Sequence, residues 1–322
     1  MLRECLVVDG HMDTPLRILD DGVDIGERNR RVHADLPRMR EGGLDAVFLA
    51  AWVDPAYAPG GGFERGASLL AAIRGVAERH PERAGFATTA AEVRAIAAGG
   101  GIALLAAVEN GQALEGDPAN VARLAESGAR YLTLTWMNSN ELGDAAGGAS
   151  IHGGLSDLGR DVVREMERVG MVVDLAHAAT RTFFDALAMA TRPVVVSHAC
   201  TEARGHHPRN VSDDQIRAVA ETGGLIGIAF MPAYLDPGAP ETADSGAIVD
   251  HLERVAGVAG VDHAALGSDL DGIPALPGGI RGVEDLPVVV QELERRGWGG
   301  GDLEKVLGGN WLRVIAATDP PG

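Results

Sequence analysis

A histidine and an aspartate two residues apart, His11 and Asp13, end the first apolar run of the chain in the stretch LVVDGHMDTP. Side chains at positions i and i+2 of a β-strand point to the same side, so this imidazole and this carboxylate could bind one cation. They could equally form a hydrogen-bonded pair at a strand end. The rest of the chain has to decide between the two interpretations.

Residues with hydrogen-bonding or ionisable side chains, among them histidines and carboxylates, follow several later apolar runs. These residues are Glu109, Trp136, Asn138, His177, His198, Asp269 and Asp271. Taken singly, each could be an ordinary polar residue at a strand end. Their meaning depends on whether the fold brings the strand ends together.

The apolar runs have the length of buried parallel strands, and amphipathic segments of helical period separate most of them. The runs cover residues 5–9, 45–52, 102–108, 130–135, 171–175, 193–197, 224–229 and 264–267. The helical segments cover residues 66–79, 88–98, 118–127, 157–169, 180–190, 212–222 and 245–259. Eight strands with helices between them predict a closed (β/α)₈ TIM barrel in the α/β class. We expect residues 1–322 to form a single barrel domain with a C-terminal helical extension, and residues 9–44 to be irregular.

Composition excludes several classes of partner. The net charge of −18 disfavours binding to nucleic acid or to an anionic membrane surface, because both would repel the protein. No apolar run approaches the roughly 20 residues of a membrane span, and the N-terminus lacks the features of a signal peptide. The two cysteines, Cys5 and Cys200, do not suggest a disulfide framework. We therefore expect a cytoplasmic protein in a reducing compartment.

In a barrel of this type, the ends of all strands meet at one face. Three histidines and three carboxylates gathered there would be costly unless a cation joined them. Imidazole and carboxylate ligands together suit zinc and neighbouring divalent metals. Five ligands are too many for one tetrahedral catalytic zinc, but they suit two ions that share a bridging carboxylate. A carbamylated lysine cannot be the bridge, since Lys305, the only lysine, lies past the last strand. Glu109 is the natural bridge instead.

Segments across most of the chain resemble the membrane (renal) dipeptidase family, metallopeptidase family M19 of the amidohydrolase superfamily. The segments that carry the resemblance are DGHMDTP, AVENG, LGRDVVREMERVGMVVDLAHA, RPVVVSHACTEA, HPRN and LGSDLDG. The resemblance implies a barrel of the metal-dependent hydrolase type with two Zn²⁺ ions. It places His11 and Asp13 on one ion and His177 and His198 on the other, with Glu109 bridging them.

The same resemblance implies a zinc-dependent dipeptidase that cleaves its small substrate through a metal-bridging hydroxide. Asp269 would be the catalytic residue that handles the proton of that water. Arg209 would bind the free carboxylate of the dipeptide through its planar guanidinium, with Trp136 and Asn210 as further substrate-binding candidates. The family also suggests tolerance of a D-residue at the C-terminal position, and homodimers are common in it.

The sequence departs from the family pattern at Trp136. Mammalian members have a histidine here, after YLTLT, which is thought to polarise the scissile carbonyl. An indole can donate one hydrogen bond but cannot carry a positive charge, so Trp136 is either a replacement donor or simply a wall of the pocket. Asp271 could orient a metal histidine or form the turn in DLDG. For Asp174 we expect a hydrogen-bonding role instead of metal binding.

Two alternative functions are compatible with the same residues. A related binuclear-metal amidohydrolase could act on N-acyl amino acids, cyclic amides or lactones. A non-catalytic, metal-bound ligand-binding protein belongs to another class, although it would not need to retain a proton carrier at Asp269.

Overall fold

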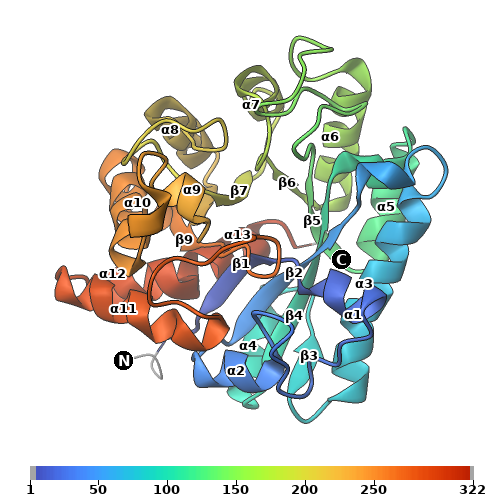
Figure 1. Ribbon diagram of the computed structural model, residues 1–322. Coiled ribbons are helices and arrows are strands. Elements are labelled where there is room, and N and C mark those ends of the chain that lie inside the picture. The colour runs from blue at the N-terminus through green and yellow to red at the C-terminus, as the bar shows by residue number, and fades with distance from the viewer. Residues whose placement is uncertain (1–4, 320–322) are drawn as a thin grey trace.

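Nine parallel strands form the sheet of the computed structural model, which describes residues 5–319 (Figure 1). Eight of them close into a barrel, because β1 pairs with both β2 and β9, while β2 pairs with β4. The strands are β1 (Val8–Met12), β2 (Ala46–Trp52), β3 (Ala84–Phe86), β4 (Ile102–Glu109), β5 (Ala129–Thr133), β6 (Val172–Asp174), β7 (Val195–Ala199), β8 (Leu225–Ile228) and β9 (Ala264–Leu266). The predicted (β/α)₈ fold is confirmed.

Strand β3 is the one strand that the apolar runs do not predict. It has only three residues, AGF, and pairs with the beginning of β4 through Ile102–Leu104. The later residues of β4, from Ala106 on, pair with β5. β3 therefore extends the sheet at the rim without entering the closed barrel.

Helices surround the barrel (Figure 1). They are α1 (Thr14–Asp20), α2 (Leu36–Glu41), α3 (Gly62–Arg79), α4 (Ala90–Ala98), α5 (Ala119–Glu126), α6 (Asp157–Val169), α7 (Thr180–Leu187), α8 (Asp213–Glu221), α9 (Pro232–Leu235), α10 (Ser245–Ala259), α11 (Leu286–Arg295), α12 (Gly300–Glu304) and α13 (Asn310–Ala317). The predicted segments 157–169 and 245–259 coincide with α6 and α10. The expected irregular region contains the two short helices α1 and α2.

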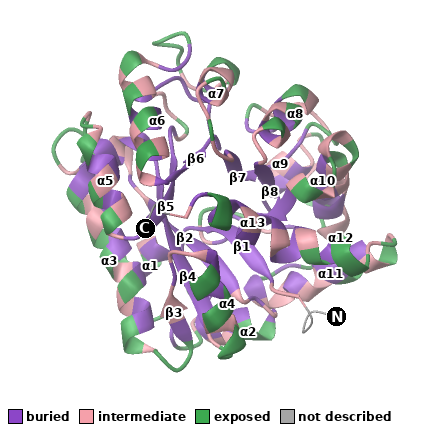
Figure 2. Cartoon of the chain, turned by 180° about the vertical axis from the view of Figure 1, so that it is seen from behind, coloured by how far each residue is buried: buried purple, intermediate pink, exposed green. Residues whose placement is uncertain are grey.

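Local signals explain where the helices begin and end. Ser156 caps α6 by accepting the N–H of Gly159, and Gly170 ends the helix with φ +74°. Thr89 and Glu92 form a capping box at the start of α4. Figure 2 shows the resulting pattern: the strands of the closed barrel are almost entirely buried, whereas many helices combine a buried side with an exposed one.

The barrel interior near the strand starts is filled by an apolar cluster that includes Val8, Phe48 and Trp311. The indole of Trp311, on α13, donates to the carbonyl of Leu266 at 2.9 Å. A Cβ on Gly10 would overlap this ring, so β1 needs a glycine there. The C-terminal helix thus closes the barrel core at the end remote from the predicted site.

Among the helices within residues 5–319, none combines the length and the apolar character needed to cross a membrane.

Candidate metal centre and substrate site

All five predicted metal ligands and Asp269 lie together at the carboxyl ends of the strands. Two of the histidines lie inside strands, His11 in β1 and His198 in β7, and Glu109 is the last residue of β4. The other ligands and Asp269 lie on the loops that directly follow β1, β6 and β9. β1 and β7 begin later than predicted, so both strand histidines lie within strands instead of after them.

Irregular backbone directs several of these side chains toward the centre. The pairing register shifts between Asp9 and Met12 and between Val196 and Ala199, in the stretches that contain the two strand histidines. Such irregularities change the direction in which a side chain points. The φ values of His177 and Asp269 are +66° and +63°, a left-handed conformation uncommon for residues other than glycine.

The two oxygens of Glu109 face different histidines. Its Oε2 lies 3.5 Å from Nε2 of His11. Its Oε1 lies 3.0 Å from Nε2 of His177 and 3.6 Å from Nε2 of His198. The carboxylate therefore stands between two sets of ligand atoms.

Asp13 and Asp269 complete the side of the centre that His11 begins. Nε2 of His11 lies 3.8 Å from Oδ2 of Asp13, and one ligand atom from each of the three residues lies within 4.8 Å of the others. A Cβ on Gly272 would overlap a carboxylate oxygen of both aspartates. The glycine of the DLDG segment thus leaves room for two carboxylates to approach the backbone.

Burial dominates the electrostatics of the centre. Burial, followed by the positive charge of Arg209, lowers the pKa of His177 to about 4, so its imidazole is neutral at neutral pH, as a metal ligand must be. Burial and the Glu109 carboxylate raise the pKa of Asp13 to about 6. Burial and the Asp13 carboxylate raise the pKa of Asp269 well above its ordinary value. Repulsion between carboxylates is therefore built into the centre.

The arrangement fits divalent metal ions. Nε2 of His11 and Oδ1 of Asp13 are buried and have no hydrogen-bond partner in the structure. Two ligands of one zinc ion, each about 2.0–2.2 Å from it, can lie at most about 4.4 Å apart. The measured ligand separations of 2.8 to 3.8 Å respect that limit. Imidazole and carboxylate donors also suit zinc or a neighbouring metal.

Arg209 lies beside the centre as a buried cation without a carboxylate partner among residues 5–319. It is 4% exposed, and its Nη2 donates to the carbonyl of His198 at 3.0 Å. Its Nε is buried and has no acceptor, and the guanidinium lies 5.5 Å from the ring centre of Tyr234. A buried cation of this kind can accept an anionic group from a ligand.

The other two predicted substrate-binding residues differ in their surroundings. Trp136 lies edge-on to Trp52 at 4.9 Å between ring centres and 6.4 Å from the ring of His177, so it borders the centre. The amide nitrogen of Asn210 donates to the carbonyls of Tyr234 and Gly205. Only Oδ1 of Asn210 has no partner, and its role toward a substrate stays a prediction.

Two residues outside the predicted site contact its histidines. The hydroxyl of Tyr131 lies 2.6 Å from Nδ1 of His11, and the hydroxyl of Ser197 lies 2.9 Å from Nδ1 of His198. Ser197 directly precedes its histidine in the sequence, which is a signal that could have identified it. Asp271 instead accepts from Thr14 and from the backbone of His33, which stabilises the loop.

A cavity of about 330 Å³ lies at the end of β2, where Trp52 and Asp271 form part of its wall; the predicted metal ligands and Asp269 do not line it. β2 and Arg209, which follows β7, lie on opposite sides of the barrel: β4, β5 and β6 separate β2 and β7 one way, and β1, β9 and β8 the other.

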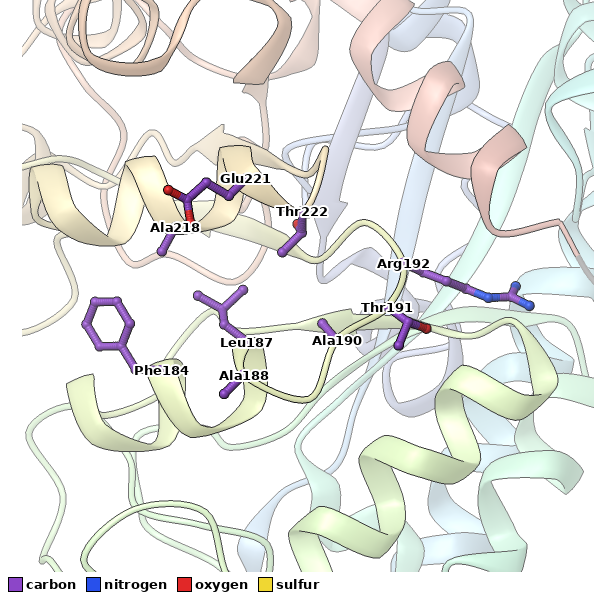
Figure 3. A pocket seen from close by; sticks show the side chains of 9 residues that line it. All are labelled: Phe184, Leu187, Ala188, Ala190, Thr191, Arg192, Ala218, Glu221 and Thr222. Atoms are coloured by element: carbon purple, nitrogen blue, oxygen red, sulfur yellow. The ribbon is translucent and has the colours of Figure 1, made fainter.

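A larger cavity, of about 490 Å³, lies between α7 and α8 and is lined by residues such as Leu187 and Thr222 (Figure 3). Both helices end there and lead into the beginnings of β7 and β8. The cavity therefore lies at the end of the barrel remote from the candidate centre, and no predicted site residue lines it.

Comparisons with protein families, curated proteins and solved structures all find dipeptidases or metallo peptidases. The family model described as membrane dipeptidase (peptidase family M19) matches residues 1–320. The chain is 32% identical to the dipeptidase verJ of Clonostachys rogersoniana, covering 99% of this chain and 86% of that protein. It is 35% identical to the dipeptidase tcpJ of Claviceps purpurea, covering 89% of this chain and 69% of that protein. A solved metallo peptidase from Rhodobacter sphaeroides, liganded with a phosphinate mimic of the dipeptide L-Ala-D-Ala, is 25% identical with a TM-score of 0.87, and the match covers 98% of this chain and 99% of that one.

Proposed function

Since this chain belongs to the membrane dipeptidase family, peptidase family M19, and is therefore a metal-dependent hydrolase of dipeptides, we propose that it works with two Zn²⁺ ions. His11 and Asp13 would hold one ion, His177 and His198 the other, and Glu109 both. The observation that carries this proposal is that Glu109 turns one oxygen toward His11 and the other toward the remaining two histidines. A single carboxylate in that position can serve two ions.

When bound, such a pair of ions makes a water molecule acidic enough to act as a nucleophile at neutral pH. A carboxylate oxygen of Asp269 lies within 4.8 Å of ligand atoms of His11 and Asp13, so Asp269 could take the proton of a water bound beside them. Burial and the Asp13 carboxylate raise the pKa of Asp269, so it can hold the proton and pass it to the leaving amine.

Arg209 supplies the position of the substrate. A dipeptide carries a free carboxylate next to its only peptide bond, and the buried, unpaired guanidinium can bind that group through two hydrogen bonds. The C-terminal residue then lies toward β7 and the amino-terminal residue toward β2. The cavity there is lined by four aspartates, including Asp54 and Asp271, and by two arginines, Arg17 and Arg65. This excess of negative charge favours the free amino group and a basic amino-terminal side chain.

A library of L,L and L,D dipeptides, assayed with zinc-loaded protein, tests this function. We expect hydrolysis of dipeptides, tolerance of a D-residue at the carboxyl end, and faster cleavage after a basic residue than after an acidic one. Dialysis against a strong chelator should abolish the activity, and added Zn²⁺ should restore it. Full activity of metal-free protein would contradict the proposal.

A matched substrate separates this function from its rivals. Dipeptide amides keep the scissile bond but lack the carboxylate, so we expect their kcat/KM to fall by about 10- to 100-fold, the equivalent of one charge-assisted hydrogen-bonding contact. Preferential hydrolysis of N-acyl amino acids or lactones would indicate a related amidohydrolase. Zinc binding without any turnover would indicate a ligand-binding protein.

A further inference from the structure

The two strand histidines of the candidate centre each contact a hydroxyl group on the side remote from the centre. Nδ1 of His11 lies 2.6 Å from the hydroxyl of Tyr131, and Nδ1 of His198 lies 2.9 Å from the hydroxyl of Ser197. Tyr131 and Ser197 are themselves buried. A neutral imidazole has one N–H donor and one acceptor nitrogen, so these contacts bear on which nitrogen carries the proton.

The proton of the Tyr131 hydroxyl is already used elsewhere. This hydroxyl donates to the carbonyl of Gly10 at 3.0 Å, and a phenol has only one proton to donate. Both hydrogen bonds of Tyr131 can form together only if Nδ1 of His11 is the donor to the phenol oxygen. Nε2 of His11, which is buried without a hydrogen-bond partner, then carries the lone pair.

The same reasoning applies to Ser197 through a buried carboxylate. The Ser197 hydroxyl donates to Oδ2 of Asp174 at 2.6 Å. Asp174 also accepts the hydroxyl of Thr133 and the backbone N–H groups of Ala176 and Ser197. With four donors directed at its two oxygens, Asp174 is an acceptor only. Ser197 must then accept from Nδ1 of His198, which leaves the lone pair on Nε2.

We propose that Tyr131 and Ser197 are positioning residues that hold His11 and His198 in the tautomer protonated at Nδ1, with both Nε2 lone pairs aimed at the metal centre. His177 differs, because its Nδ1 has no hydrogen-bond partner. The protein thus fixes two of its three metal histidines before any ion binds. This inference rests on the proposed metal centre.

Removing one hydroxyl should weaken metal binding without disturbing the packing. Removing the hydrogen-bond partner of a metal-binding histidine typically lowers metal affinity by about 10- to 100-fold. Y131F keeps the ring, which packs 5.0 Å from the ring of Phe48, and S197A removes a single oxygen. T133V is the matched control, because Thr133 donates to the same Asp174 carboxylate but contacts none of the three histidines.

The dissociation constant of Zn²⁺ from metal-free protein, measured by competition with a chromophoric chelator, is the primary readout. We expect it to rise about 10- to 100-fold in Y131F and S197A and to stay within about twofold of the wild type in T133V. In ¹⁵N spectra of histidine-labelled, metal-free wild-type protein, the signals assigned to His11 and His198 should be those of Nδ1-protonated imidazoles. Y131F should shift the signal of His11, and S197A should shift that of His198.

Three outcomes would overturn the inference: unchanged affinity in Y131F and S197A, equal weakening in T133V and S197A, or Nε2 protonation of His11 and His198 in the wild type. If S197A does not fold, Y131F decides by itself. Wild-type protein that binds no zinc would instead contradict the proposed function, so the two failures are distinguishable.

Discussion

Arg38 and Arg209 are both buried, but only Arg38 pairs its charge with carboxylates of the protein. Arg38, on α2, is 6% exposed; it pairs with Asp35 at 2.7 Å and donates to the carbonyls of Asn29 and Val32. Arg209 is buried to a similar degree, but it has one carbonyl acceptor and a buried Nε without a partner. Burial alone therefore does not distinguish a structural charge from a functional one.

The difference lies in the unpartnered atoms. A buried charge or lone pair without a partner destabilises the fold, so it persists only where something else selects for it. Around Arg38 each buried polar nitrogen has an acceptor. Beside Arg209, unpartnered atoms of His11 and Asp13 lie within one centre. We take such clustering as the mark of a site that a ligand completes.

The largest effect on activity should come from removing an ionisable group inside the candidate metal centre. Asp269→Asn keeps the shape of the side chain but not its capacity to carry a proton, so kcat for dipeptides should fall by about 10²- to 10⁴-fold. Steady-state kinetics and the zinc content of the purified variant are the measurements. Loss of zinc in the variant would show that Asp269 is a ligand and not a proton carrier.

The two arginines should respond in opposite ways to truncation. Arg38→Ala leaves the buried Asp35 carboxylate without its partner and should lower the free energy of unfolding by about 3–5 kcal/mol. Arg209→Ala leaves no carboxylate unpaired, so it should lower stability less than Arg38→Ala does, while KM for dipeptides rises by roughly 10- to 100-fold. Urea denaturation and kinetics on both variants test this contrast. If Arg209→Ala lost as much stability as Arg38→Ala, the contrast between a structural and a functional arginine would be wrong.

A smaller effect, on stability, should come from substituting Asp144. This residue lies on the loop that contacts His177, and both of its carboxylate oxygens accept hydrogen bonds. Its oxygens accept the backbone N–H groups of residues 151–154 and the hydroxyl of Ser150. Although burial opposes the shift, the N–H groups of His152 and Ile151 lower the pKa of Asp144 to about 2. Asp144→Asn places an amide against these donors and should lower the free energy of unfolding by about 1–3 kcal/mol.

The pH dependence of that loss has a definite sign. Because the pKa of Asp144 is lower in the folded state than its ordinary value of 3.8, the carboxylate stabilises the fold fully above that value. The contribution is lost as pH falls through about 2. The stability difference between wild type and Asp144→Asn, measured by denaturation, should therefore shrink from pH 4 to pH 2. A constant difference would assign the loss to packing.

The sequence by itself determined the barrel and the approximate position of the centre. Strand and helix periods are local properties, so α6 and α10 have the predicted bounds. Parallel strands with intervening helices force their carboxyl ends to one face, which is why Glu109, His177 and Asp269 could be grouped without coordinates.

Only the tertiary structure decided which buried groups complete one another. The hydroxyl that contacts His11 comes from Tyr131, 120 residues away, and the strand register that turns both strand histidines inward is irregular. The pairing of Arg38 with Glu284 and the lack of any carboxylate on Arg209 within residues 5–319 are likewise contacts across the fold. Local periodicity carries no information about such contacts, because they depend on how distant segments pack.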